Sequence, residues 1–463
     1  PNQARCRKSS TTESARLIAR WGPAEFSDDS AQPTMQQAPN PQPTIPSTGL
    51  ILTGGGARAA YQVGVLAALA QLRRDAGVTD ANPFPIIAGT SAGAINAATL
   101  ACQADDFDAA VDGLVYIWQN IHVDQVYASD SFGVIRTGAR WMTMMSLGWA
   151  LARWKRSRPK SLLDNAPLGE LLRRWVRLER LDEMLAAGHM QALAISGSSY
   201  TSGQHVTFYQ THKPLQPWLR SQRIAVKAQL SIEHLMASSA IPFIFPAEHL
   251  DLDGQMEWFG DGSMRQSAPI SPAVHLGAER VLVIGAGRMH EPPGRRTTLV
   301  EGHPTMAQIA GHALSNIFLD ALAVDVERLQ RINNTLALLP PEARQATPLR
   351  PIDVLVIAPS RRLDELAAEH QGSLPPAMRA LLRSAGAQGA AKGEGKGASG
   401  SALTSYLLFE PSFTGELINL GMSDTLARRA DVQRFFGWPA QAPSIDPAAM
   451  RRRRAGFAEG VAA

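Results

Sequence analysis

Short apolar runs alternate with stretches of helical periodicity from about residue 50 to about residue 436. Strand-like runs occur at residues 50–53, 85–88, 191–196, 205–209, 280–284 and 353–357. Helical spacing of apolar residues occurs at 63–72, 107–120, 167–187, 232–239, 305–332 and 402–436. Strands that alternate with helices predict an α/β fold of three layers around a mostly parallel central sheet.

The two ends of the chain lack this pattern. Residues 30–48 carry five prolines among Gln, Ser and Thr, which is typical of an extended linker. We therefore expect a flexible tail and linker at 1–48, a catalytic domain at 49–290 and a C-terminal α/β and helical extension at 291–440. A Gly/Ala/Lys-rich loop is expected within that extension at 386–401, and a flexible basic tail at 441–463.

The string GTSAG at residues 89–93 lies between a strand-like run and a small-residue helical run. Strand, tight turn and helix in this order are the context of a nucleophile elbow, which predicts a catalytic role for Ser91. The glycines let the turn adopt strained dihedrals, and the following helix directs its N-terminal N–H groups at a developing anion. A G-x-S-x-G string alone often occurs by chance, so the argument depends on a second motif.

The second motif is the run Gly54, Gly55 and Gly56, which follows the first predicted strand. Three residues without side chains leave their N–H groups open to a substrate oxygen, as an oxyanion hole requires. The run lacks the G-K-[ST] ending of a nucleotide-binding P-loop, and no acidic residue stands where a dinucleotide fingerprint would place one.

A third motif places Asp261 between Gly260 and Gly262. Alone, Asp-Gly is most often a turn. Together, the strings GGGAR at 54–58, GTSAG at 89–93, ASSAIP at 237–242 and Asp261-Gly262 make the chain resemble a bacterial patatin-like phospholipase from about residue 49 to about residue 287.

The resemblance implies a Ser–Asp dyad, with Ser91 as nucleophile and Asp261 as base. It also implies an oxyanion hole at Gly54, Gly55 and Gly56, supported by Arg58. The chain departs from the family at Ser263, where Gly or Ala is usual, and at Ala59, where the family often has Gly.

A free aspartate, with a pKa of about 3.9, is a poor base for a hydroxyl proton. Burial would raise its basicity, and Trp258, Phe259 and Met264 could supply the dry surroundings. The competing hypothesis is a Ser-Asp-His triad. Five histidines follow Asp261 in the chain and could complete one: His275, His290, His303, His312 and His370.

Composition fits an ordinary globular enzyme. The chain has 463 residues, of which 45% are hydrophobic and 19% charged, with a net charge of +4. Cys6 and Cys102 cannot form a disulfide framework, and no metal-ligand cluster or cofactor is expected. No secretory signal and no run of 18 apolar residues are visible. We expect a cytoplasmic protein, free or peripheral at the inner membrane face, and no nucleic-acid partner; the oligomeric state stays open.

One stretch bears on lipid contact. Residues 141–152 are free of charge, and cations follow directly. Aromatic and cationic side chains together suit a headgroup boundary, although a core helix with a basic end has the same pattern. The candidate membrane contacts are Trp141, Trp149, Arg153, Trp154, Lys155, Arg156 and Arg158.

The sequence thus predicts a lipid acyl hydrolase that cleaves fatty-acyl esters through an acyl-enzyme. The alternatives are a carboxylesterase or lipase for neutral or soluble esters, and a membrane-binding regulatory protein with little turnover. The sequence does not indicate the headgroup, sn-position or chain length of the substrate.

Overall fold

The computed structural model describes residues 46–79, 82–128, 161–252, 254–289, 303–387 and 401–439, all within one compact unit, Pro46–Ala463. The candidate membrane contacts at 141–158 and His290 therefore lie outside the described residues, as do the basic tail at 441–463 and most of the loop at 386–401.

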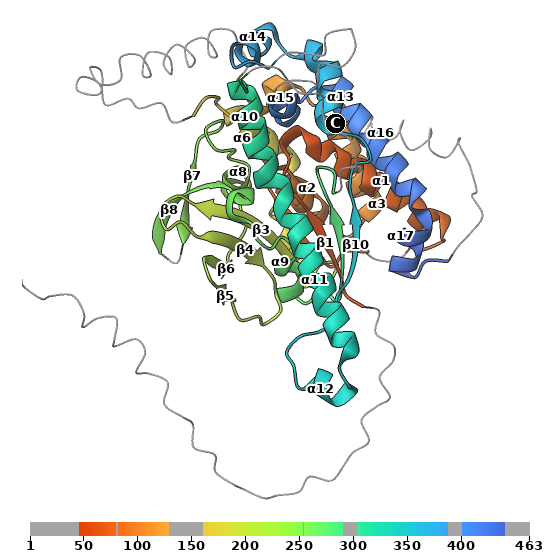
Figure 1. The fold of residues 1–463 in the computed structure, drawn as a ribbon. Coiled ribbons are helices and arrows are strands. Elements are labelled where there is room, and N and C mark those ends of the chain that lie inside the picture. Colours follow the sequence, from red (N-terminus) through yellow and green to blue (C-terminus); the bar gives the residue numbers. More distant parts are fainter. Residues whose placement is uncertain are drawn as a thin grey trace, which may run out of the picture. The chain divides into compact units, whose positions relative to one another are not determined.

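A mixed sheet of ten strands forms the centre of this unit (Figure 1). Eight of them follow the order β10-β9-β1-β2-β3-β4-β6-β5, while β8 pairs with β3 outside this order and β7 pairs with β8. Strands β10, β9, β1, β2 and β3 are mutually parallel, and β4, β5, β7 and β8 enter through antiparallel pairs. The strands are β1 Thr48–Leu52, β2 Ile86–Thr90, β3 Ala192–Ser199, β4 His205–Gln210, β5 Leu219–Arg220, β6 Arg223–Lys227, β7 Glu248–Leu252, β8 Gln255–Asp261, β9 Arg280–Ile284 and β10 Asp353–Ile357. The expected α/β fold with a mostly parallel sheet is confirmed.

Two hydrophobic cores, one on each face of the sheet, make the fold three-layered. Leu50 and Leu52 of β1 face the larger core, which the helices of the first layer cover, whereas Ile51 between them faces the smaller core. Since successive side chains of a strand point to opposite faces, one apolar strand contributes to both cores. The helices on the larger core include α1 Ala60–Asp75, α2 Ala92–Ala101, α3 Phe107–Gln119, α6 Ala166–Trp175, α8 Ile232–Ser238 and α16 Pro411–Ala427.

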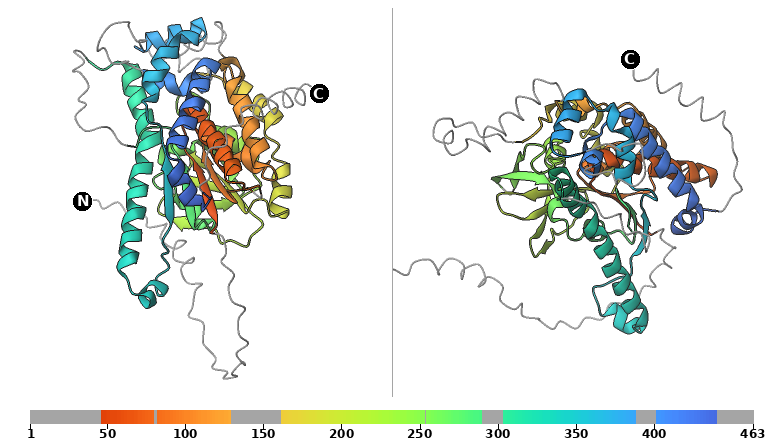
Figure 2. Two further views of the ribbon diagram at one scale, coloured as in Figure 1. Left: turned by 90° about the vertical axis from the view of Figure 1, so that its right-hand side faces the viewer. Right: turned by 45° about the horizontal axis from the view of Figure 1, so that its top comes forward.

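The smaller core is covered by α9 Ser271–His275 and α11 Ala321–Leu338. Figure 2 shows α10 Met306–Ser315 and α11 as one long helical column beside the sheet, joined by the π-helical turn η3 Asn316–Asp320. The remaining elements are α4 Val123–Val126, α7 Arg180–Ala186, α12 Pro341–Gln345, α13 Leu363–His370, α14 Pro376–Ser384, α15 Ser401–Leu407 and α17 Arg429–Phe436, with the short turns η1 Gly56–Ala59, η2 Gly262–Arg265 and η4 Gln371–Ser373.

The column Met306–Leu338 is the one helix of the described residues that is long and apolar enough to cross a membrane. It passes this test by length and composition alone, and it contains no uninterrupted run of 18 apolar residues. The column nonetheless packs on the sheet, because Leu322 is buried in the smaller core and Asp325 accepts a hydrogen bond from the Ile270 amide at 3.0 Å.

Two predicted helices are divided. The stretch expected as one helix at 167–187 is α6 and α7, because Val176 adopts an extended conformation that ends α6. The stretch at 402–436 is α15, α16 and α17, with Pro411 beginning α16. Proline favours the first turn of a helix and disfavours a helical residue before it, which explains that break.

Residues beyond 303 are built into the same unit. Strand β10 pairs with β9 over Asp353–Ile357, and α16 packs along α1. The Tyr61 hydroxyl of α1 donates to Asp424 of α16 at 3.0 Å. The C-terminal segment thus helps to hold the elements that carry the glycine run.

Candidate active site

Ser91 occupies a strained turn between β2 and α2. Its φ of 57° lies in the left-handed region that residues with a Cβ rarely adopt. The Ser91 amide donates to the Ser238 hydroxyl at 2.9 Å, and a side chain at Gly93 would meet the Leu52 carbonyl oxygen. Such strain persists only where the surroundings hold it, and it lifts the hydroxyl clear of the strand. The role of Ser238 as a support of the turn was missed from sequence.

The register of β3 explains why Ser91 and Asp261 meet. Strand β2 runs parallel to β3 and ends with Thr90 opposite Ser196, one residue before Ser91. Strand β8 runs antiparallel to β3 and ends with Asp261 opposite Gly197. Because β4 occupies the other edge of β3, both strands lie on one edge and run toward each other. Their carboxyl ends therefore meet at two consecutive residues of β3.

Asp261 is fully buried. Its Oδ1 accepts a hydrogen bond from the Ser263 amide at 2.9 Å, and its Oδ2 has no partner with standard hydrogen-bond geometry in the described chain. Burial raises the pKa of Asp261 to about 6, against a smaller lowering by the hydroxyls of Ser91 and Ser263 and the Ser263 amide. A carboxyl with a raised pKa and a free oxygen beside a serine hydroxyl is suited to accept a proton near neutral pH.

The side chains that bury Asp261 differ from those expected. Phe259 is fully buried, but Trp258 is 47% exposed and stacks on His249 with ring centroids 4.5 Å apart. The alternation of side chains along β8 accounts for this, because residues 259 and 261 share one face and residue 258 points to the other. Met264 is partly buried and accepts a hydrogen bond from the Tyr200 hydroxyl.

The glycine run lies beside the nucleophile turn. Among the residues that the structure describes, the amides of Gly54 and Gly55 have no hydrogen-bond partner. Gly56 has a φ of 54°, and a side chain there would meet the Tyr406 carbonyl oxygen of α15. Unpaired amides next to a nucleophile provide the donors that an oxyanion requires.

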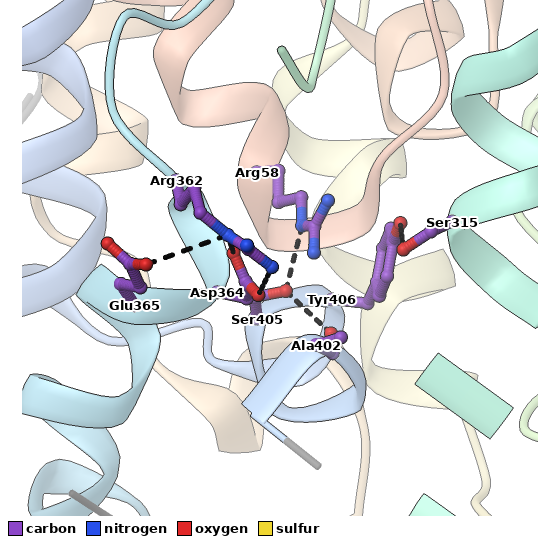
Figure 3. A network of polar contacts seen from close by, with 8 residues as sticks. All are labelled: Arg58, Ser315, Arg362, Asp364, Glu365, Ala402, Ser405 and Tyr406. Atoms are coloured by element: carbon purple, nitrogen blue, oxygen red, sulfur yellow. Dashed lines mark hydrogen bonds and ion pairs between the residues drawn. The ribbon is translucent and has the colours of Figure 1, made fainter. Parts of the chain in front are cut away.

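Arg58 is held by the C-terminal segment (Figure 3). Its Nε donates to the Ser405 hydroxyl at 2.8 Å, and its guanidinium lies 4.0 Å from the ring centroid of Tyr406. The Asp364 carboxyl of α13 belongs to the same cluster, where Arg362 and, more weakly, Arg58 lower its pKa. Arg58 would therefore support the oxyanion site by anchoring η1, and not by direct contact of its guanidinium with the oxyanion.

An apolar cavity begins at Ser91 and passes between α2, α3 and α6. Its volume is about 60 Å³, which makes it narrow. Gly56, Ser91 and Ser239 contribute to its lining. The remainder is lined by Ala92, Ile95, Thr99, Leu114, Ile117, Trp118, Ile121, Val126, Leu168, Leu171, Leu172, Trp175, Val176, Ile241, Phe245 and Phe409.

The histidines of the competing triad lie elsewhere. His275 stacks on Trp218 with ring centroids 4.7 Å apart, and His370 contacts Glu416 at 2.6 Å. No contact of His275, His303, His312 or His370 with Ser91 or Asp261 is present within the described ranges. The geometry favours the dyad.

One histidine that contacts the aspartate motif was not considered from sequence. His205 is buried on β4 and hydrogen-bonds the backbone of Gly262, and burial lowers its pKa to about 4. A neutral histidine of this kind packs and positions the chain. Among the residues that the structure describes, no group of three or more His, Cys, Asp or Glu could hold a metal ion.

The chain is similar to one known family and to several solved structures. Residues 50–274 match the family model described as patatin-like phospholipase. No curated protein matches the chain. Among solved structures, a human GIVD cytosolic phospholipase A2 in complex with a fluorophosphonate inhibitor is 12% identical, with a TM-score of 0.38. The match covers 85% of this chain and 59% of that one.

Two bacterial structures are similar at comparable levels. VipD from Legionella pneumophila is 13% identical, with a TM-score of 0.25 over 81% of this chain and 67% of that one. ExoU from Pseudomonas aeruginosa, solved with SpcU, is 17% identical, with a TM-score of 0.22 over 90% of this chain and 79% of that one.

Proposed function

We propose that this chain is a lipid acyl hydrolase of the patatin-like phospholipase family, working through a Ser91–Asp261 dyad. The match of residues 50–274 to the family supports acyl hydrolysis of lipids. The observation that carries the proposal is the meeting of two strand ends. The strained Ser91 and the buried Asp261 carboxyl follow from these two strand ends, and Ser91 also lines the apolar cavity, which supports the proposal.

In the first half-reaction, Ser91 Oγ attacks the ester carbonyl carbon while Asp261 Oδ2 takes the hydroxyl proton. The negative charge that develops on the carbonyl oxygen is stabilised by the amides of Gly54 and Gly55 and by the N-terminus of α2. The carbon–oxygen bond then breaks, and the alcohol or lysolipid leaves with the proton from Asp261. The product is an acyl group esterified to Ser91.

In the second half-reaction, Asp261 takes a proton from water, whose oxygen attacks the acyl carbon. The fatty acid leaves, and the proton returns to Ser91 Oγ. A base with a pKa near 6 is largely ionised at neutral pH and is basic enough to assist both attacks.

The cavity favours a fatty-acyl ester over a small polar one. A straight acyl chain would lie along the leucine side chains and Trp175 of α6, with its carbonyl carbon at Ser91. At about 60 Å³ the cavity is too narrow for a long chain without movement of its walls, so we expect α3 and α6 to separate slightly on binding. A carboxylesterase for short esters would need no such movement and is the second candidate.

A membrane-binding regulatory protein is the candidate from another class. It would need neither strain at Ser91 nor a buried carboxyl beside it. Contact with anionic membranes through Trp141, Trp149, Arg153, Trp154, Lys155, Arg156 and Arg158, and a cytoplasmic, peripheral location, remain part of the proposal.

The experiment is hydrolysis of a panel comprising phosphatidylcholine vesicles, phosphatidylglycerol vesicles, a triacylglycerol emulsion and p-nitrophenyl butyrate. It compares wild type with Ser91→Ala, and with Ser373→Ala as a matched control on the exposed turn η4. We expect the wild type and Ser373→Ala to cleave phospholipid and Ser91→Ala to cleave nothing on the panel. Cleavage of p-nitrophenyl butyrate alone would favour the carboxylesterase, and no cleavage together with vesicle binding would favour the regulatory protein.

A further inference from the structure

A buried polar network reaches both ends of the glycine run. Gln62 of α1 and Asn96 of α2 are fully buried. Gln62 Nε2 donates to the Thr53 carbonyl oxygen at 2.7 Å, just before the run. Asn96 Nδ2 donates to the carbonyl oxygen of Ala59, the last residue of η1, at 3.3 Å. The two amide side chains therefore grip the chain on either side of residues 54–58.

The same two side chains bond to each other and to the cavity wall. Asn96 Nδ2 donates to Gln62 Oε1 at 3.1 Å, and the Trp118 indole Nε1 donates to Asn96 Oδ1 at 2.9 Å. An indole N–H can only donate, so it fixes Asn96 with its oxygen toward α3 and its NH₂ toward the loop. That orientation in turn makes Gln62 present its own NH₂ to Thr53.

We propose that Gln62 and Asn96 are positioning residues that hold the oxyanion loop, residues 53–59, in register with Ser91, and that Trp118 links this network to the acyl cavity. The inference rests on the proposed function. Asn96 lies on the helix that begins directly after Ser91, and Gln62 lies on the helix that follows the loop. One pair of side chains thus sets the distance between nucleophile and oxyanion donors.

Three features distinguish this network from a core that merely tolerates polar groups. The two carbonyl oxygens that it binds flank the glycine run, because Thr53 precedes the run and Ala59 ends the turn η1 that follows from it. Both hydrogens of the Asn96 amide are used, which leaves no alternative orientation. Opposed to it, Tyr406 and Phe318 press on the loop from the C-terminal segment, with ring centroids 5.1 Å apart. The loop is therefore fixed from two sides.

Trp118 belongs to both the network and the cavity. Its ring lines the cavity that begins at Ser91, and its N–H fixes Asn96. An acyl chain lying against this ring would hold the indole in place. The geometry therefore connects occupation of the cavity with the orientation of the oxyanion donors.

The test uses Gln62→Met, Asn96→Leu and their double variant, which keep side-chain volume and remove the polar grip. Trp118→Phe removes the indole N–H and keeps an aromatic ring. Thr425→Val is the matched control, because Thr425 is fully buried and its hydroxyl donates to Gly421 at 2.7 Å within α16, outside the network and the cavity. Each variant is measured with p-nitrophenyl butyrate after titration of active sites with a fluorophosphonate.

Small displacements of catalytic groups can cost about 10²-fold in rate, so we expect Gln62→Met and Asn96→Leu each to lower kcat by that amount with KM nearly unchanged. The double variant should be little worse than either single variant, because members of one unit are not additive. Trp118→Phe should lower kcat by roughly 10-fold, and Thr425→Val should lower the melting temperature with kcat per titrated site unchanged.

Hydrogen–deuterium exchange of the peptide covering residues 53–59 supplies a readout without activity. Exchange should be faster in Gln62→Met and Asn96→Leu than in wild type and Thr425→Val. If both variants kept wild-type kcat and wild-type exchange, the positioning role would be wrong even with an active wild type. If the wild type lacked hydrolysis that depends on Ser91, the proposed function would fail while the exchange rates still decided the network.

Discussion

The two strand ends that meet on β3 prepare their catalytic groups in different ways. At the end of β2, Ser91 is held in a strained backbone conformation and is followed by the helix α2. At the end of β8, Asp261 has ordinary dihedrals and is followed by a single turn, but its carboxyl is buried with one oxygen unpaired. The backbone of Ser91 is thus under conformational strain, whereas the ionised carboxylate of Asp261 is destabilised by desolvation.

This difference separates two kinds of mutational effect. Changes around Ser91 and the glycine run should alter rate by geometry, at every pH. Changes around Asp261 should alter the pH dependence of both rate and stability. The comparison also explains which catalytic group a local sequence motif can identify. The strain at Ser91 depends on a few adjacent residues, whereas the burial of Asp261 depends on residues that are distant along the chain.

The largest effect is expected from removing either partner. Ser91→Ala and Asp261→Asn should each lower kcat for ester hydrolysis by about 10³-fold or more, since removal of one member of a catalytic unit costs on this order or above. Steady-state kinetics with p-nitrophenyl butyrate and a phospholipid measure the loss. The double variant should be little worse than Ser91→Ala. An Asp261→Asn enzyme with near-normal turnover would return attention to the histidines.

A smaller loss of kcat is expected from changes in the glycine run. In Gly55→Ala, the new Cβ would lie 2.6 Å from the Cβ of Ala286, so the loop must shift. Displacing one oxyanion donor should lower kcat by about 10²-fold to 10³-fold. Gly415→Ala is the control, because a Cβ there meets nothing within 4 Å on α16. If kcat of Gly55→Ala equalled that of Gly415→Ala, Gly55 would not belong to the oxyanion hole.

The burial of Asp261 predicts that replacing it lowers catalytic activity but raises folding stability at high pH. Because the folded-state pKa of Asp261 is raised from 3.8 to about 6, folding favours the protonated carboxyl. The contribution of protonated Asp261 to folding stability is fully present below pH 3.8, decreases between pH 3.8 and pH 6, and is absent above pH 6. At 1.36 kcal/mol per pKa unit, ionised Asp261 costs up to about 3 kcal/mol at pH 8.

Asp261→Asn should therefore melt at a higher temperature than wild type at pH 8, with the two proteins more alike at pH 4. Thermal unfolding of both at several pH values checks this. An Asp261→Asn protein that is less stable than wild type at pH 8 would contradict the picture of a desolvated base. That result would not affect the roles inferred for Ser91 and the glycine run.

The finest test concerns Ser263, the departure from the family pattern. Its hydroxyl is buried and lowers the pKa of Asp261. Ser263→Ala removes that contact, so the pKa of Asp261 should rise and the acidic limb of kcat/KM should move to higher pH by a fraction of a unit to about one unit. A pH profile between 4.5 and 9 measures the shift. An unchanged limb would mean that Ser263 does not act on the carboxyl.

What the sequence could predict follows the same division. The elbow at Ser91 and the glycine run are each contained in a few residues, and both lie where expected. The strands and the parallel sheet followed from short β-branched runs. Asp261 was reached through its Gly-Asp-Gly string, but its position opposite Gly197 depends on β8 pairing with a distant strand. Local pattern carries no information on that register.

Other contacts were missed for the same reason. Ser238, which accepts a hydrogen bond from the Ser91 amide, lies in the string at 237–242, but nothing in that string indicates this contact. Tyr406, whose carbonyl oxygen lies against Gly56, is far from every motif along the chain. The prediction that Trp258 helps to bury Asp261 was wrong. Trp258 is offset by one residue from Phe259 along β8, so its ring lies on the exposed face of the strand. The breaks at Val176 and Pro411 lay in stretches whose helical composition hid them.

The most direct measurement of the central claim is the pH dependence of Ser91 labelling by a fluorophosphonate, located by peptide mass spectrometry. The account predicts modification at Ser91, with a rate that rises with pH through a single pKa near 6, the pKa of Asp261. The Asp261→Asn variant should label far more slowly and without that inflection. Labelling of Ser91 that proceeds equally fast in Asp261→Asn, or modification of another serine, would contradict the dyad.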